Sequence, residues 1–95
     1  EPGFYEYDWG GIRLENLYFV KKAEGLQKHP GGKGWLCFET LTLIPFERRL
    51  IERNILAEEE LNWLDEYHVQ VLEKISPLLN NPEDVQWLTW ACEMD

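Results

Sequence analysis

The sequence predicts an α+β fold, with a small, mainly antiparallel sheet in the first half followed by two helices. Two segments rich in β-branched and aromatic residues, 12–21 and 35–45, are separated by a loop with strong turn signals. After Pro45 the apolar residues recur at spacings of three and four, which is the period of a helix. An Asn-Asn-Pro sequence at 80–82 then indicates that one helix stops and another begins.

The first half contains the two predicted strands. Residues 1–11 are rich in glycine and aromatics and predict a turn followed by an irregular connection. The strand at 12–21 (IRLENLYFVK) is apolar on both faces, which is typical of a strand inside a sheet covered on two sides. The polar loop 22–34 contains HPGGKG, and the strand at 35–45 (WLCFETLTLIP) follows it. Because strands adjacent in sequence often pair, we expect a hairpin with a long loop.

The second half contains the two predicted helices. The first is expected over 57–79, with glutamates at 58–60 in its first turn, where the helix dipole favours acids. Pro77 is expected to kink or end this helix, because proline lacks the N–H that the helix needs. The second helix is expected over 82–93, with Asn81 as its N-cap and proline as its first residue.

The charge of the chain is uneven along its length. The formal net charge is -9, and counting acids and bases gives -1 for residues 1–46 (6 acids, 5 bases) and -8 for residues 47–95 (12 acids, 4 bases). An acidic second half argues against nucleic acid or an anionic membrane as a partner and is typical of a solvated helical face. No apolar run approaches the roughly 20 residues of a membrane span.

The two cysteines indicate a cellular compartment, and the first residue indicates a longer parent protein. Cys37 and Cys92 have no neighbours at metal-ligand spacing, and two cysteines do not make a disulfide framework. We expect reduced, buried thiols and a cytoplasmic protein. Because the sequence opens at Glu1 without a starting methionine, we expect it to be a piece of a longer protein.

Two carboxylates in the first half are candidates for chemistry. Glu1 opens Glu-Pro-Gly, in which proline holds the preceding residue extended and Pro-Gly favours a turn. Glu15 lies between Leu14 and Leu17 in the predicted strand, where a buried carboxylate needs a cation or hydrogen bonds to offset its desolvation. Arg13, on the same face, meets that need, and a metal ion would also meet it. The pattern alone favours a buried Arg13–Glu15 pair, because two isolated carboxylates do not identify a metal site.

The ordered set of motifs resembles the C-terminal part of the pita-bread metallopeptidases, and of the long Xaa-Pro aminopeptidases in particular. EPGFYE and GIRLEN are similar to the last metal-binding strands of that family. CFETLTLIPF is similar to a segment of the long Xaa-Pro aminopeptidases, and LNWLDEYH followed by DVQWLTW is similar to their C-terminal extension. The resemblance implies that residues 1–46 are the last strands of a pita-bread domain and that residues 47–95 are a helical extension.

The resemblance also implies a set of site residues. The family site holds two divalent ions, usually manganese, between two Asp, one His and two Glu, and the two Glu correspond to Glu1 and Glu15 here. Arg13 matches the arginine beside the second glutamate, which would keep that carboxylate ionised and aimed. The remaining ligands of the family would lie upstream of Glu1. Oxygen ligands of this kind suit manganese. The isolated chain is therefore expected to be metal-free and inactive.

Several other polar residues are expected to be structural. Glu39 belongs to the LTLIP segment but matches none of the family's ligands, and it is expected to have a structural or rim role; Thr40 stands where many relatives carry proline. His68 lies on the apolar face of the first helix and is expected to be a hydrogen-bonded core or boundary histidine. His29 is expected to be a loop residue, and the glutamates at 58–60 are expected to serve capping and solubility.

Three tryptophans, Trp63, Trp87 and Trp90, form a stripe on the predicted helices. Core or domain-interface packing is the expected role, and the stripe is also the best candidate for a subunit contact. Strands that are apolar on both faces add a tendency to self-associate when separated from a parent sheet. We therefore expect a homo-oligomer, such as a dimer.

These observations lead to one main functional hypothesis and two alternatives. The resemblance implies a hydrolase, an aminopeptidase that cleaves the N-terminal Xaa-Pro bond of peptides with proline at the second position. A non-catalytic pita-bread relative that serves as a protein-binding or dimerisation module is the second hypothesis. The third hypothesis is a prolidase or a methionine aminopeptidase. The helical tail after LTLIP favours the long Xaa-Pro aminopeptidase form over these two enzymes.

Overall fold

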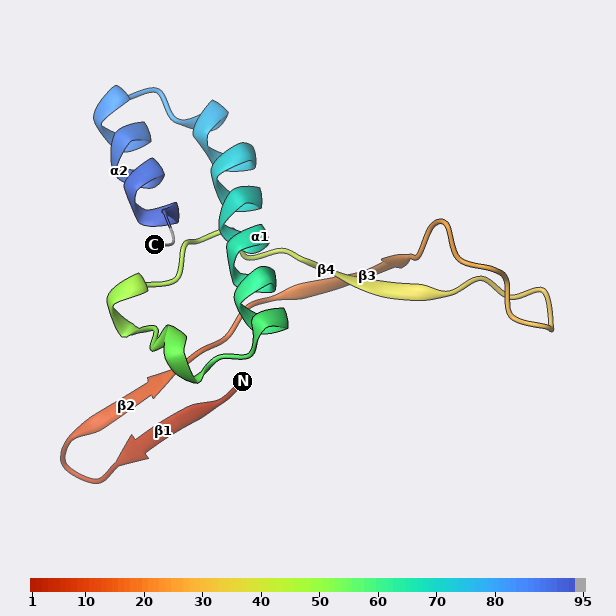
Figure 1. Ribbon diagram of the computed structural model, residues 1–95, viewed down its shortest axis with the longest axis horizontal. Coiled ribbons are helices and arrows are strands. Elements are labelled where there is room, and N and C mark those ends of the chain that lie inside the picture. The colour runs from red at the N-terminus through yellow and green to blue at the C-terminus, as the bar shows by residue number, and fades with distance from the viewer. Residues whose placement is uncertain (94–95) are drawn as a thin grey trace. The chain divides into compact units, whose positions relative to one another are not determined.

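The computed structural model describes residues 1–93 and contains two compact units, Glu1–Thr42 and Leu43–Asp95. The first, the hairpin unit, contains two separate two-stranded antiparallel sheets, and the second, the helical unit, contains the two helices (Figure 1). The fold class is therefore α+β, as the sequence predicts.

The first hairpin pairs β1 (Gly3–Glu6) with β2 (Gly10–Arg13) in a register that runs from Gly3 opposite Arg13 to Glu6 opposite Gly10. A tight turn joins the strands, with Asp8 at a φ of 60° and a hydrogen bond of 3.2 Å from the Trp9 N–H to the Glu6 carbonyl. The prediction of an irregular connection over residues 1–11 is wrong, because this turn lets the two short segments pair with each other.

The second hairpin pairs β3 (Tyr18–Lys22) with β4 (Leu36–Thr40), with Tyr18 opposite Thr40 and Lys22 opposite Leu36. The predicted hairpin with a long loop is confirmed. Both strands are shorter than expected, and the single strand predicted over 12–21 is divided between β2 and β3. The chain changes its hydrogen-bond partner between these two strands. Before the break it pairs with β1, and after the break Leu17 bonds to Leu41 and Thr42, which follow β4.

The helical unit begins with two short 3-10 turns, η1 (Arg48–Leu50) and η2 (Arg53–Ile55), before α1 (Glu58–Ile75). The predicted first helix is confirmed, but it ends at Ile75 and continues only as a 3-10 turn, η3 (Ser76–Leu78). Pro77 lies in that turn and explains the end of α1, because its missing N–H interrupts the helical hydrogen bonds.

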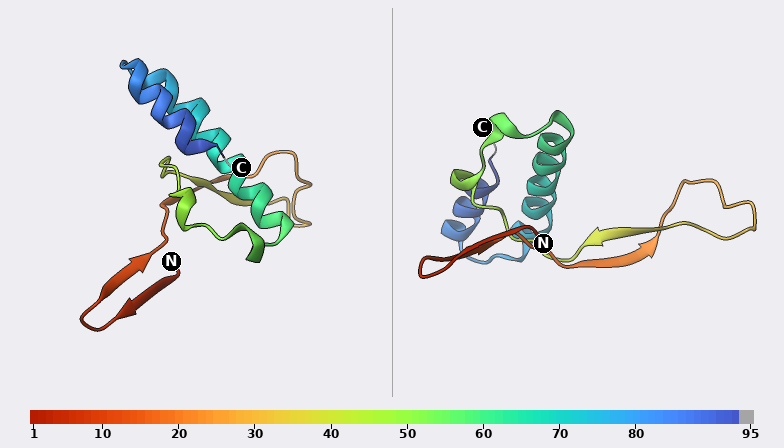
Figure 2. Two further views of the ribbon diagram at one scale, coloured as in Figure 1. Left: turned by 60° about the vertical axis from the view of Figure 1, so that its left-hand side comes forward. Right: turned by 90° about the horizontal axis from the view of Figure 1, so that it is seen from below.

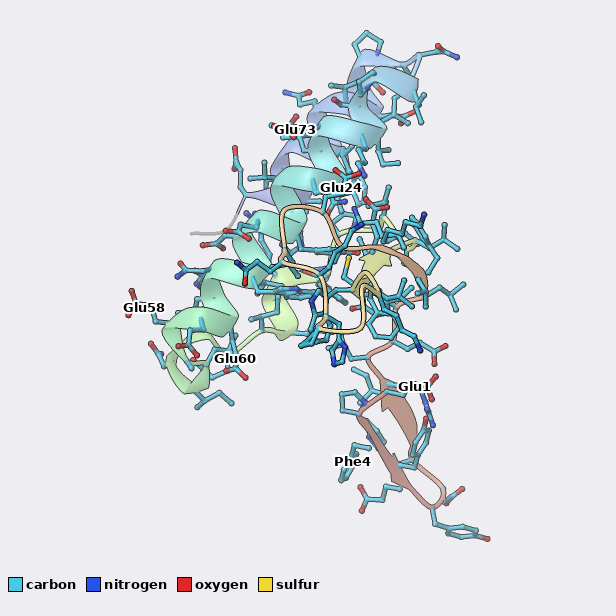
Figure 3. All side chains as sticks on the ribbon, turned by 90° about the vertical axis from the view of Figure 1, so that its right-hand side faces the viewer. Glu1, Phe4, Glu24, Glu58, Glu60 and Glu73 are labelled. Atoms are coloured by element: carbon cyan, nitrogen blue, oxygen red, sulfur yellow. The ribbon has the colours of Figure 1, made fainter. Side chains whose placement is uncertain are left out.

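The second helix, α2 (Pro82–Cys92), also follows the sequence prediction. The Asn81 side chain accepts a hydrogen bond of 2.9 Å from the Glu83 N–H, which is the expected N-cap. At the start of α1, the Glu60 carboxylate accepts a hydrogen bond of 2.8 Å from the Ala57 N–H. The capping role expected for the glutamates of the first turn is therefore confirmed at Glu60. Glu58, Glu60 and Glu73 project outward along α1 (Figure 3).

The core of the helical unit lies between α1 and α2, which run side by side (Figure 2). Tyr67, Val71 and Leu88 are buried at its centre. Partly buried residues pack around them: Leu43, Phe46, Leu72, Ile75, Leu79 and Cys92. The segment Leu43–Glu47, which we call the connector, thus contributes two of the core side chains. Within the described residues, neither helix combines the length and apolarity that a membrane crossing requires.

The tryptophan stripe does not belong to this core. Trp63, Trp87 and Trp90 keep 47%, 58% and 42% of their surface exposed. Of the two predicted roles, core packing is therefore wrong, and domain-interface packing stays a prediction. Trp63 stacks on Tyr67 with ring centroids 5.5 Å apart, and the Trp90 ring lies 4.0 Å from the Arg48 guanidinium carbon. Trp63 and Trp90 therefore lie outside the buried core and pack on a neighbouring ring and a guanidinium group, respectively.

Candidate functional site

One face of the β1–β2 hairpin brings together the residues that the sequence analysis singled out. The register pairs Gly3 with Arg13 and Tyr5 with Gly11, and these four residues share a face because side chains alternate along a strand. A hydrogen bond of 3.0 Å from the Leu14 N–H to the Pro2 carbonyl extends the pairing beyond the strands.

The same register, continued by two residues, places Glu1 opposite Glu15. Directly opposed residues of an antiparallel pair have Cβ atoms about 4.5–5.5 Å apart. Glu1 and Phe4 project on opposite sides of the hairpin, as the alternation requires (Figure 3). The two glutamates therefore lie next to each other at the open end of the hairpin, although 14 positions separate them in the sequence.

Tyr5 lies over the two glycines of this face. A Cβ added at Gly3 would come within 2.9 Å of the Tyr5 ring, and a Cβ added at Gly11 would overlap it. The absence of side chains at Gly3 and Gly11 lets the ring lie along the hairpin and brings its hydroxyl to Arg13. Sequence reasoning missed Tyr5, and the glycines on either side of the Tyr-Asp-Trp turn were the signal that could have revealed the hairpin.

Arg13 is held between two partners. Its Nε donates a hydrogen bond of 2.7 Å to the Tyr5 hydroxyl, and its NH1 group lies 3.1 Å from Glu1 Oε2. The expectation of a buried Arg13–Glu15 pair is wrong, because Arg13 reaches across the hairpin to Glu1 and both Arg13 and Glu15 are exposed. A strand break after Arg13 explains the exposure of Glu15, since Glu15 does not enter a covered sheet.

The chemistry of this face fits part of a divalent metal site. Carboxylate oxygens are ligands that manganese and magnesium prefer, and like charges directly opposite each other on a hairpin are unfavourable without a cation. Arg13 balances one of the two charges, and within residues 1–93 the Glu15 carboxylate has no hydrogen-bond or ion-pair partner. The described residues contain no group of three or more His, Cys, Asp or Glu that could hold a metal ion by themselves.

The remaining polar candidates have structural roles. Glu39 lies 3.6 Å from the Lys21 ammonium across the β3–β4 hairpin, in agreement with the expected structural or rim role. His29 is an exposed loop residue whose Nδ1 accepts a hydrogen bond from the Gly31 N–H. Cys37 and Cys92 are free thiols and partly buried, and burial raises the pKa of Cys92.

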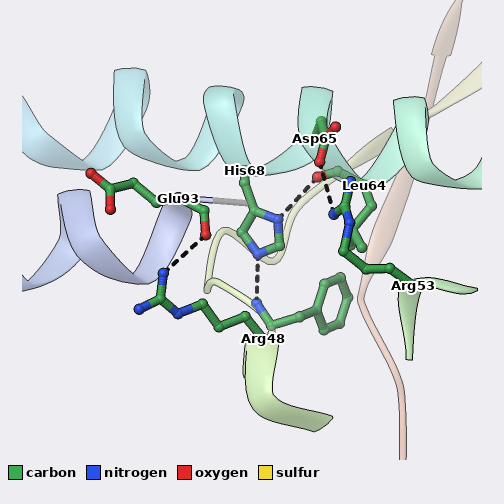
Figure 4. A network of polar contacts seen from close by, with 7 residues as sticks. Arg48, Arg53, Leu64, Asp65, His68 and Glu93 are labelled. Atoms are coloured by element: carbon green, nitrogen blue, oxygen red, sulfur yellow. Dashed lines mark hydrogen bonds and ion pairs between the residues drawn. The ribbon is translucent and has the colours of Figure 1, made fainter. Parts of the chain in front are cut away.

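His68 is fully buried in the helical unit, and both ring nitrogens have partners (Figure 4). The Phe46 N–H donates 3.0 Å to Nε2, and Nδ1 lies 3.0 Å from the Leu64 carbonyl. The predicted role of a hydrogen-bonded core histidine is confirmed. His68 belongs to the helical unit, and the described residues contain no group of three or more possible metal ligands around it.

A hollow of the helical unit is lined by residues 45–48, Trp87, Trp90 and Ala91. Arg48 lies against the Trp90 ring and donates a hydrogen bond of 3.3 Å to the Glu93 carbonyl. Glu47 binds Arg49 through two hydrogen bonds of 2.9 Å, and this guanidinium lowers the pKa of Glu47 to about 2.

Comparison with known proteins agrees with this picture of a strand-and-helix terminal segment. Residues 34–94 match the family model described as the C-terminal region of peptidase M24. The chain therefore belongs to the peptidase M24 family and contains its C-terminal region. This confirms, at the level of the family, the resemblance that the sequence motifs indicated.

Individual relatives are similar over almost the whole chain. Aminopeptidase P2 of Arabidopsis thaliana is 43% identical over 88 residues, which is 93% of this chain and 12% of that protein. The probable Xaa-Pro aminopeptidase P of Coprinopsis cinerea is 43% identical over 89 residues, 93% of this chain and 14% of that protein. Xaa-Pro aminopeptidase app-1 of Caenorhabditis elegans is 36% identical over 96 residues, 98% of this chain and 15% of that protein. The chain thus spans only 12–15% of the length of these relatives.

Proposed function

We propose that this chain is the C-terminal part of an Xaa-Pro aminopeptidase, a metal-dependent hydrolase that releases the first residue from peptides with proline at the second position. Membership of the peptidase M24 family supports a peptidase, and the names of the relatives support this substrate class. The relatives are about seven times longer than the chain, so the rest of the catalytic site would lie in the remainder of the polypeptide.

The opposed carboxylates of the first hairpin carry this proposal. Glu1 and Glu15 would each contribute oxygen ligands to a pair of divalent ions, for which manganese is the proposed metal. When bound, the two ions would supply the Lewis acidity that polarises the scissile carbonyl and activates a water molecule. The hairpin would contribute a fixed separation between two ligands, because strand pairing holds the backbone on both sides of the site.

Arg13 would act as a positioning residue for the ligands. Its guanidinium bonds to Glu1 and would orient that carboxylate toward a metal ion. Tyr5 holds the other side of the same guanidinium and so fixes its direction. Because Arg13 bonds to Glu1, we propose that it orients Glu1 directly. Its effect on Glu15 would be indirect, since Glu15 lies opposite Glu1 on the same face of the hairpin.

The 95-residue chain by itself would bind metal weakly and would not turn over peptides. This follows from the number of ligands, because two carboxylates do not fill the coordination sphere of two divalent ions and no larger cluster exists among residues 1–93. The intact protein would gain the missing ligands from its upstream part. Free thiols at Cys37 and Cys92 are compatible with the proposed cytoplasmic location, and the exposed tryptophans are compatible with a homo-oligomer.

The proposal is tested in the intact polypeptide that carries these residues. Release of the first residue from an Xaa-Pro-Yaa peptide is measured with and without added Mn²⁺, beside Glu15→Gln and the matched control Glu24→Gln, which alters an exposed loop carboxylate. We expect Mn²⁺-dependent release that Glu24→Gln retains and Glu15→Gln loses by at least about a hundredfold. A folded, metal-loaded protein without activity would instead favour a protein-binding or dimerisation module, and equal activity in both variants would remove Glu15 from the site.

A further inference from the structure

The connector is joined to α1 by two hydrogen bonds of different chemistry. The Tyr67 hydroxyl donates 2.6 Å to the Ile44 carbonyl, and this bond is the same at every pH at which the phenol is neutral. The Phe46 N–H donates 3.0 Å to Nε2 of His68, and this bond depends on the protonation state of the imidazole. The two bonds lie two residues apart on the connector and come from adjacent residues of α1.

The partners of His68 define its tautomer. The Leu64 carbonyl can only accept a hydrogen bond, so the contact of 3.0 Å requires a proton on Nδ1. The Phe46 amide can only donate, so Nε2 must be unprotonated. The ring is therefore neutral, and a second proton would place an N–H of the imidazolium against the N–H of Phe46.

The surroundings offer little to stabilise an imidazolium. Of the charged groups on the elements around the ring, the Asp65 carboxylate acts on His68. Other charged or titratable groups on these elements include Glu47, Arg48, Arg53, Tyr67 and Cys92. Asp65 is the anion that favours the charged ring, but its carboxylate also accepts a bond of 3.3 Å from Arg53 (Figure 4). Arg48 is a cation turned toward the Glu93 carbonyl, and the Glu47 carboxylate is bound by Arg49.

We propose that His68 is an acid-sensitive latch, whose protonation at Nε2 breaks the bond to Phe46 and releases the connector from α1. His68 has no exposed surface, so the ring cannot turn toward solvent to accommodate the added proton without local opening. Release would expose Phe46, which packs on Tyr67 with ring centroids 5.0 Å apart, and would loosen the core to which the connector contributes. This inference does not depend on the proposed peptidase activity.

The direction of the pH effect follows from the two states of the ring. Burial lowers the pKa of His68 in the closed state, although the Leu64 carbonyl bonded to Nδ1 and the Asp65 carboxylate act in the opposite direction. Once released, the ring regains the ordinary pKa of about 6.5. Below about pH 6.5 the open state therefore binds more protons than the closed state. The latch is closed above this pH, and it weakens as the pH falls toward the lowered pKa of the closed state.

The test is amide hydrogen exchange of Phe46 in the 95-residue chain, measured between about pH 7.5 and pH 5 and corrected for intrinsic exchange. We expect the protection of the Phe46 amide to fall by up to about tenfold per pH unit below about pH 6.5. His68→Gln retains an acceptor without a titratable ring, and it should remove this dependence. The other histidine provides the matched control, because His29→Gln should leave the dependence unchanged.

A second measurement covers the case in which His68→Gln does not fold. Nitrogen-15 spectra of the histidine rings in the unaltered chain report the tautomer directly, and we expect His68 to carry its proton on Nδ1 at neutral pH. A ring protonated on Nε2, or a Phe46 amide whose protection is constant while His68 titrates, would overturn the proposal.

Discussion

The two units of this chain differ in how far they bury their apolar side chains. The helical unit contains all the buried side chains of the described residues, including Tyr67, Val71 and Leu88. The hairpin unit has none, and side chains such as Phe38 and Leu36 stay 75% and 68% exposed. The hairpin unit nevertheless contains the metal-site residues that we propose for this chain, Glu1 and Glu15. The comparison shows that the helical unit forms a core of its own, whereas the hairpin unit leaves its apolar side chains exposed.

The largest effect expected from this difference concerns two leucines. Leu88→Ala should lower the free energy of unfolding of the helical unit by about 2–5 kcal/mol, because Leu88 is 3% exposed and its loss leaves a cavity. Leu36→Ala, which alters an exposed leucine of β4, should change it by less than about 0.5 kcal/mol. Urea unfolding followed by far-ultraviolet circular dichroism measures both. Equal losses would contradict the division into a cored and an uncored unit.

A smaller effect is expected from the second bond between the connector and α1, which does not involve His68. Tyr67→Phe removes the hydroxyl that donates 2.6 Å to the Ile44 carbonyl and should cost about 1–2 kcal/mol of unfolding free energy. The same urea titration, repeated at about pH 7.5 and pH 5.5, should give the same loss at both. A loss confined to the lower pH would contradict the independence of this bond from the protonation state of His68.

The N-cap of α2 should contribute less again. Asn81→Ala removes the side chain that accepts a hydrogen bond from the Glu83 N–H and should lower the unfolding free energy by about 1 kcal/mol. Asn80→Ala changes the same residue type one position earlier, outside the cap, and should have almost no effect. Thermal unfolding of the two variants side by side distinguishes a cap from a general effect of losing asparagine.

The smallest effect on stability is expected at the proposed site. Arg13→Lys should change the unfolding free energy by less than about 0.5 kcal/mol, because the Arg13–Glu1 pair is exposed. In the intact protein it should reduce peptide hydrolysis by about tenfold or more, since lysine cannot bond to Tyr5 and Glu1 with a rigid fork. Lys21→Arg, which retains a cation beside Glu39, is the control. Full activity in Arg13→Lys would show that the guanidinium geometry is unimportant.

The sequence predicted the helical unit better than the hairpin unit, for a physical reason. Helix periodicity, the Asn81 cap and the stop at Pro77 are local signals, and the structure contains all three. Strand pairing is not local, so the first hairpin was missed and one predicted strand turned out to be two. Core packing was predicted as one of two roles for the tryptophans because large aromatic rings favour burial, but the structure leaves all three rings substantially exposed.

The sequence identified candidate site residues but not the contacts between them. Glu1, Glu15 and Arg13 were named through the resemblance of their motifs, and their assignment to a metal site remains a prediction. Their arrangement required the register, which places Arg13 opposite Gly3. From there the Arg13 side chain bonds to Glu1 and Tyr5 and not to Glu15. In the sequence Arg13 lies two positions from Glu15, and only the folded hairpin shows that its side chain bonds to Glu1.

The short turn at residues 7–9 has a consequence for how the chain tolerates insertions. Because this turn sets the register of β1 against β2, adding or removing a single residue there would move Glu1 to the face opposite Glu15. The loop at residues 23–35 of the second hairpin carries no such constraint, since no proposed ligand depends on the pairing of β3 with β4. Natural length variation between members of this family should therefore be absent from the first turn and common in the second loop.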